Sequence, residues 1–181
     1  MEVPVEDKRK ELSSDNSLIE KAKHGHKEAF CELIREQKTS MYSVARNILK
    51  NNEDIGDAIS ETILKAYKNI GELKESSYFK TWLIRILINQ CYEICRKNKR
   101  VVLLHKDNIL ENEEYIDNYE NIDLRRALDT LEDELKILVV LYYYQDMSIQ
   151  DIGETLDIPQ GTVKSRLARA RKRLYLILKE E

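Results

Sequence analysis

The residues with the clearest chemistry are basic side chains near the C-terminus. Lysine and arginine occupy six of the ten positions from 164 to 173, and no acidic residue follows until Glu180. Ammonium and guanidinium groups bind backbone phosphates, and arginine can also donate two hydrogen bonds to guanine. We therefore expect this segment to bind DNA, with an ordinary solvated basic helix as the alternative. The basic residues are Lys164, Arg166, Arg169, Arg171, Lys172 and Arg173.

The surrounding residues predict a helix-turn-helix that would present this basic segment. Ser148 is a suitable N-cap for a first short helix, and Asp151 stands at the capping-box position. Gly153 leaves room for a second helix to approach closely, residues 157–159 form the turn, and residues 160–162 begin the second helix. Such a helix enters the major groove with its N-terminal half. Its expected packing stripe is Val163, Leu167, Ala170 and Leu174.

A second set of polar side chains shares one face of a helix expected from about Phe79. The set offers a hydroxyl, an amide, an aromatic ring and guanidinium groups at helical spacing. Single-stranded nucleic acid needs this mixture, because cations bind its phosphates, rings stack on its bases and amides pair with base edges. The set consists of Thr81, Arg85, Asn89, Tyr92 and Arg96.

Other kinds of chemistry find little support in the sequence. It contains no phosphate-cradling glycine loop, no HExxH motif and no convincing nucleophile–base pair, so we predict that the protein is not an enzyme. Cys91 and Cys95 are four residues apart, but neither a histidine nor a third cysteine lies nearby. Such cysteines are commonly buried as small apolar side chains, and we predict no metal site and no cofactor.

The elements that must position these faces are expected to be helices throughout. Five glycines and two prolines in 181 residues, with 35% charged side chains, favour an all-α fold. Helical periodicity covers residues 16–100 and residues 122–181, which predicts two small helical domains, the second a helix-turn-helix domain. We interpret residues 1–15 as a disordered N-terminus. Residues 101–121 are acidic and lack a sustained period, which predicts a flexible linker.

The first predicted domain contains a short helix near Ser17 and three longer helices. Glu53 and Asp54 suit the first turn of the third helix, which is expected to end before Gly71. The fourth helix has an apolar stripe that includes Phe79 and Trp82, both interpreted as core residues. The rest of that stripe is Leu83, Ile86, Leu87 and Ile94.

Basic patches at residues 96–100 and 164–173 flank an acidic segment, although the net charge is only −3. This distribution predicts two DNA contacts joined by a linker that avoids duplex DNA.

The lack of a long apolar segment and of a secretory signal indicates a cytoplasmic protein. The longest apolar run, residues 137–144, is far shorter than the roughly 20 residues that span a membrane. Residues 1–16 contain no apolar core of a secretory signal. We therefore expect no membrane insertion.

The second predicted domain resembles the helix-turn-helix of the extracytoplasmic-function group of sigma factors. Pro159 and residues 161–167 and 169–171 match the family pattern P-xGTVKSRLxRAR in place, whereas Gly153 replaces the usual alanine and Glu132 stands where proline is common. The resemblance implies that this domain binds the −35 promoter element. The implied contacts are Gln160, Thr162, Lys164, Ser165, Arg166, Arg169, Arg171, Lys172 and Arg173.

Residues 52–62 resemble the family segment that docks on a coiled coil in the largest catalytic subunit of RNA polymerase. Ser60 replaces the usual glutamine of this segment and Ile63 the usual phenylalanine. From spacing alone, a solvated charged face would look the same as an interface. The implied polymerase-binding residues are Asp54, Asp57, Ser60, Glu61, Leu64 and Lys65.

Residues 79–89 resemble the family pattern FrtWLyrIaxN. The resemblance implies contact with the non-template strand of the −10 element, and a base flipped into a pocket formed by residues 72–78. Capture of unpaired bases would then drive promoter melting. The implied contacts are Tyr78, Lys80, Thr81, Arg85, Asn89, Tyr92 and Arg96.

The sequence as a whole predicts a sigma factor that binds core RNA polymerase and promoter DNA. The family resemblance also implies an anti-sigma factor as a partner and a role in a stress-response regulon. A stand-alone helix-turn-helix regulator that binds duplex DNA without polymerase is the alternative.

Overall fold

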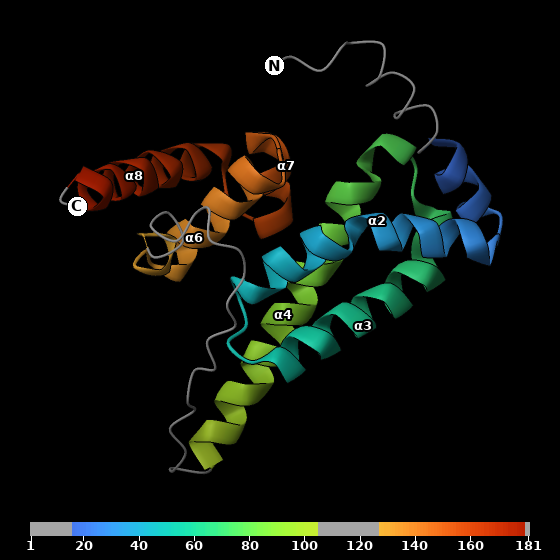
Figure 1. Ribbon diagram of the computed structural model, residues 1–181, viewed down its shortest axis with the longest axis horizontal. Coiled ribbons are helices and arrows are strands. Elements are labelled where there is room, and N and C mark those ends of the chain that lie inside the picture. The colour runs from blue at the N-terminus through green and yellow to red at the C-terminus, as the bar shows by residue number, and fades with distance from the viewer. Residues whose placement is uncertain (1–15, 105–126, 180–181) are drawn as a thin grey trace.

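The computed structural model describes residues 16–104 and 127–179, and every element in these ranges is helical (Figure 1). The predicted all-α fold is therefore confirmed, while the predicted disordered N-terminus and most of the predicted linker lie outside the described residues. Within these ranges, no helix has the length and apolar character needed to span a membrane.

The elements of the first half are helical residues 16–23, α2 (Lys27–Arg46), α3 (Asn52–Asn69), η1 (Ile70–Glu72), η2 (Ser76–Tyr78) and α4 (Phe79–Leu104). Helical residues 127–129, α6 (Asp133–Val139), the π-helical η3 (Val140–Tyr144), α7 (Ile149–Leu156) and α8 (Gln160–Lys179) form the second half.

Helices α2, α3 and α4 pack against one another and form a bundle (Figure 1). The apolar spacing of α2 and of α3 supplies one buried side for each helix, as the sequence predicts. Asn51 caps α3, because its Oδ1 atom accepts a hydrogen bond from the backbone N–H of Asp54 at 2.7 Å. Gly25 separates the first helical segment from α2 with φ of 88°, a conformation that glycine adopts without a steric penalty.

Helix α4 is longer and more deeply buried than its predicted stripe. Ile84, Ile88 and Cys91 are buried in addition to Leu83 and Leu87, so two adjoining sides of the helix contact the rest of the protein. The helix also continues through residues 101–104, which the sequence assigns to the linker. This segment contains neither glycine nor proline, and nothing in its local sequence ends the helix.

The second half contains the predicted helix-turn-helix in α7 and α8. The hydroxyl of Ser148 accepts the N–H of Asp151 at 3.1 Å and donates to its carboxylate at 2.6 Å. Asp157 ends α7 in the left-handed conformation, with φ of 54°. A Cβ atom on Gly153 would lie 2.9 Å from the carbonyl oxygen of Ile158, so the turn itself occupies this space. Gln160, the first residue of α8, lies 3.8 Å from the same Cβ position, so the second helix approaches Gly153 as predicted, although the turn makes the closer contact.

The two halves contact each other through α4 and α7. The ammonium group of Lys80 on α4 donates a hydrogen bond to the backbone carbonyl of Gln145 at 3.0 Å. Apolar side chains of both halves also belong to one contiguous buried cluster, which includes Leu83 and Leu87 of α4 together with Leu141 and Ile152. The bundle and the helix-turn-helix thus share part of their core.

Candidate nucleic-acid and protein interfaces

Helix α8 presents an exposed basic side opposite a buried apolar side. Val163, Leu167 and Ala170 are buried and Leu174 is partly buried, which confirms the predicted packing stripe. Most of the opposite side is exposed. Among the predicted −35 contacts, those exposed and without an ion pair in the described chain are Gln160, Lys164, Ser165, Arg171 and Lys172.

The remaining arginines of α8 form ion pairs with acidic side chains at the start of α6. Arg166 lies 2.8 Å from the carboxylate of Glu134, and the Arg166 side chain is only 30% exposed. Arg173 lies 3.1 Å from Glu132. Arg169 is more exposed and lies 3.7 Å from Glu132. The basic face that the sequence treats as uniform therefore has an exposed part and a part that joins α8 to α6.

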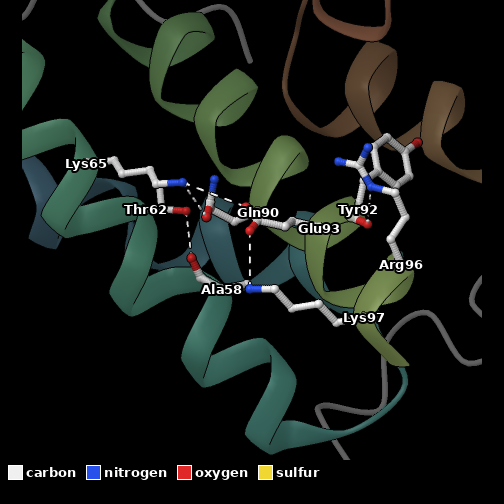
Figure 2. A network of polar contacts seen from close by, with 8 residues as sticks. All are labelled: Ala58, Thr62, Lys65, Gln90, Tyr92, Glu93, Arg96 and Lys97. Atoms are coloured by element: carbon white, nitrogen blue, oxygen red, sulfur yellow. Dashed lines mark hydrogen bonds and ion pairs between the residues drawn. The ribbon is translucent and has the colours of Figure 1, made fainter. Parts of the chain in front are cut away.

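Most of the predicted single-strand face lies exposed along α4. Arg85 and Asn89 are exposed and make no hydrogen bond or ion pair within the described residues, and Thr81 is half-buried beside them. The guanidinium of Arg96 donates to the backbone carbonyl of Tyr92 at 3.3 Å (Figure 2). The side chains of this set that are exposed to a ligand along one side of the helix are therefore Arg85, Asn89, Tyr92 and Arg96.

Tyr92 connects this face electrostatically to the second half of the protein. Burial raises the pKa of its hydroxyl, and the neighbouring Cys91 and Cys95 add to this shift. The carboxylates of Glu134 and Asp133 on α6 raise the pKa further. The acidic start of α6 thus lies near one end of the polar face of α4.

Lys80 is a predicted −10 contact on α4 that does not share this face. The helical rotation of α4 places it on the side toward the second half, where it bonds to the backbone of Gln145. Tyr78, just before α4, and Phe79, the first residue of α4, fit their expected positions better. Tyr78 is 51% exposed, whereas Phe79 is buried and its ring centre lies 6.1 Å from that of Trp82.

The segment before α4 is attached to the first helix of the chain. The hydroxyl of Ser76 donates a hydrogen bond to the carboxylate of Glu20 at 2.7 Å, and Lys23 donates to the same oxygen at 3.0 Å. These hydrogen bonds lower the pKa of Glu20, that from Ser76 having the larger effect. A contact between residues far apart in sequence thus restrains the loop that would hold a flipped base.

The predicted polymerase-binding residues line a groove between α3 and α4. Its α3 wall contains all of these residues except Leu64, which lies outside it and is 54% exposed. The α4 wall is not predicted from the sequence, although its members recur at helical spacing. The groove is lined by Asp54, Asp57, Ser60, Glu61 and Lys65 of α3, and by Gln90, Glu93, Ile94, Lys97 and Asn98 of α4.

The three cysteines differ in burial, and none of them belongs to a metal-binding group among the described residues. Cys91 is fully buried, and burial raises the pKa of its thiol to about 12, with a smaller contribution from Cys95. Cys31 is exposed on α2. No group of three or more potential ligands among the described residues is arranged to hold a metal ion. The interpretation of Cys91 as a small core residue is confirmed.

A helix-turn-helix with an exposed basic side, joined to a bundle with a polar face, defines a helical DNA-binding protein. Comparison with protein families narrows this class. Residues 33–101 match the family described as Sigma-70 region 2, and residues 121–174 match the family described as Sigma-70, region 4.

Curated relatives agree with these family matches over nearly the whole chain. The ECF RNA polymerase sigma factor SigM of Mycobacterium tuberculosis is 31% identical over 166 residues, covering 91% of this chain and 85% of that protein. The RNA polymerase sigma factor SigV of Bacillus subtilis is 28% identical, covering 89% of this chain and 98% of that protein.

Solved structures show the same fold. The sigma factor RpoE in complex with the anti-sigma factor NepR from Bartonella quintana is 25% identical, with a TM-score of 0.71 over 82% of this chain and 97% of that one. CnrH, in complex with the cytosolic domain of CnrY, is 21% identical with a TM-score of 0.65. The chain belongs to the ECF sigma factors of RNA polymerase, and its function is to direct polymerase to promoters.

Proposed function

We propose that the two halves divide promoter recognition between them. The exposed basic side of α8 binds the −35 element, and the polar face of α4 with Tyr78 binds the unpaired −10 strand. This division is supported chiefly by α8, where exposed cations without an ion pair in the described chain lie opposite a stripe whose first three residues are buried. Residues 16–104 would then form the polymerase-docking and melting domain, and residues from 122 onward the −35 domain.

The protein is proposed to act in the cytoplasm as a regulatory subunit without an enzymatic reaction of its own. Its relatives are named as sigma factors, and promoter melting needs the capture of unpaired bases but no broken covalent bond. An anti-sigma factor is a further proposed partner, because the similar Bartonella quintana protein was solved in complex with one. Release from such a partner would connect the protein to a stress response.

Transcription with purified components tests the proposal. The protein is added to core RNA polymerase and a supercoiled library of promoter DNA, and transcripts with defined start sites are expected only when both are present. Tight binding to duplex DNA without polymerase, together with no such transcripts, would favour the stand-alone regulator.

Two variants test the division between the halves. Asn89→Ala should reduce promoter opening, detected by permanganate reactivity of unpaired thymines, while leaving recruitment of polymerase to the promoter intact. Lys172→Ala should reduce recruitment itself. Equal losses in both assays for both variants would contradict the division.

A further inference from the structure

The groove between α3 and α4 extends the predicted docking face onto a second helix. The family resemblance points only to α3, but Gln90, Glu93, Lys97 and Asn98 of α4 line the same groove. We propose that this α4 wall is part of the surface that binds RNA polymerase, with Lys97 as its cationic edge. The proposal rests on the proposed docking at α3 and adds to it the orientation of the bound partner.

Lys65 of α3 bridges the two walls of the groove. Its ammonium group donates a hydrogen bond to the side-chain carbonyl of Gln90 at 2.9 Å and lies 3.8 Å from the carboxylate of Glu93 (Figure 2). Gln90 is only 7% exposed, so this bond lies at the edge of the core. Lys65, predicted as a polymerase contact, therefore positions α4 against α3.

Asp54 is likewise engaged within the protein. The side-chain amides of Asn51 and Asn98 both donate to its Oδ2 atom at 2.8 Å. Its backbone N–H is bonded to Asn51 as well. Asp54 thus fixes the end of the groove where α3 begins, and its carboxylate has less capacity to bind a partner than its position in the sequence suggests.

The charged side chains that remain available to a partner are negative on the α3 wall and positive on the α4 wall. Asp57 and Glu61 on α3 are exposed, and neither has a hydrogen bond or ion pair within the described residues. On α4, Lys97 is 69% exposed and lies 3.2 Å from Glu93. One ion pair leaves further donors of an ammonium group free, because it has three.

Glu93 does not cancel the cationic character of the α4 edge. It lies between two lysines, and the hydrogen bond and charge of Lys97, followed by the charge of Lys65, lower its pKa. Glu93 is thus ionised at neutral pH and neutralised by its neighbours. The groove then has an anionic edge formed by Asp57 and Glu61 and a cationic edge at Lys97.

This arrangement of charge defines the partner surface. It fits a helical element of polymerase that carries basic side chains along the edge facing α3 and an acidic side chain facing Lys97. Complementary charges of both signs fix orientation as well as affinity, since the reversed orientation would place like charges together. Glu93 and Lys97 also directly follow Tyr92 and Arg96, so the bound element would lie beside the single-strand face.

Binding of the full chain to core RNA polymerase tests the proposal. Lys97→Glu should weaken binding about threefold to tenfold at low salt, and the loss should shrink as salt screens exposed charges. Lys27→Glu is the matched control, because Lys27 is also an exposed helical lysine. It lies at the start of α2, near the end of α3 where Phe30 meets Tyr67, and thus away from the groove.

Two further variants separate the possible outcomes. Glu61→Lys tests docking at α3, and normal polymerase binding by this variant would overturn the proposed docking itself. Weakened binding by Glu61→Lys, with Lys97→Glu equal to Lys27→Glu, would overturn only the α4 wall. Lys97→Gln avoids a new like-charge contact with Glu93 and should show a smaller loss at an unchanged melting temperature; no loss would likewise overturn the α4 wall.

Discussion

The thiol of Cys91 lies fully inside the bundle, and burial raises its pKa from 9.0 to about 12, with Cys95 adding to the shift. The folded protein therefore holds the thiol proton more tightly than the unfolded chain does. This contribution to the free energy of unfolding is complete below pH 9 and is lost as the pH rises from about 9 toward 12. Between pH 8 and 10.5, the native protein should lose more stability than Cys91→Ala, as measured by urea unfolding.

Thiol labelling provides the control for this prediction. At pH 8, iodoacetamide should modify the exposed Cys31 first, whereas Cys91 should react only after unfolding, because the thiolate is the reactive form. Mass spectrometry of peptides identifies the modified residue. The burial argument would be contradicted if the native protein and Cys91→Ala lost the same stability between pH 8 and 10.5. Rapid labelling of Cys91 in the native protein would contradict it as well.

The sequence alone predicts the burial of Cys91 and the basic character of α8. Cys91 is expected in the core because cysteine is commonly buried, and the family pattern identifies the basic residues of α8. The family pattern does not distinguish Arg166, which is paired with Glu134, from Lys172, which is exposed and unpaired in the described chain. That difference depends on where α6 packs, which is a tertiary contact.

At the scale of an element, substitution of the Asn51 cap tests how much the start of α3 contributes to stability. Asn51→Ala removes the acceptor for the N–H of Asp54 and the donor to its carboxylate, and should cost about 1 kcal/mol of unfolding free energy. Asn52→Ala is the matched control, because Asn52 is also exposed but makes no described cap hydrogen bond. Chemical denaturation measures both, and equal costs would show that the cap contributes nothing specific.

The exposed and paired sides of α8 should respond differently to substitution. Lys172→Ala should weaken promoter binding by the holoenzyme and reduce the slope of affinity against salt by about 1, with the melting temperature unchanged. Arg166→Ala should lower the melting temperature, because it removes the 2.8 Å ion pair with Glu134 and side-chain packing between α8 and α6. Binding titrations at several salt concentrations and thermal denaturation distinguish the two effects. Identical behaviour would mean that the division of α8 into two sides is wrong.

Helix positions follow from the sequence more reliably than contacts between helices. Apolar spacing predicts the stripe of α8, and Glu53 with Asp54 predicts the first turn of α3. The second buried side of α4, at Ile84 and Ile88, is not predicted because its apolar residues continue around the helix without a single clear face. The α4 wall of the groove depends on how two helices pack, which periodicity within either helix cannot reveal.

At the scale of the whole molecule, the linker does not imply two independent cores. Sequence periodicity separates the halves because residues 101–121 lack a helical pattern, yet α4 contacts α7 and Lys80 bonds to Gln145. Apolar residues of both halves form one buried cluster that extends from Ile19 to Leu167. A second, smaller cluster lies within the second half alone and consists of Leu128, Leu131, Leu135, Val139 and Ala170. Such contacts between distant segments leave no signal in local spacing, so the sequence predicts the domains without their shared surface.

The shared cluster predicts that disturbing one half lowers the stability of the other. Trp82 is the only tryptophan in the chain, so its fluorescence reports unfolding of the first half. Leu138 lies in α6, is fully buried and belongs to the same cluster against which Trp82 packs. Leu138→Ala should cost about 2–5 kcal/mol and shift the unfolding transition of Trp82 to lower denaturant, because cooperative unfolding transmits the loss. Leu176→Ala, at a position 49% exposed, serves as the control. An unchanged Trp82 transition in Leu138→Ala, with loss of helix at lower denaturant by circular dichroism, would instead mean that the halves unfold independently and that their contact contributes little to stability.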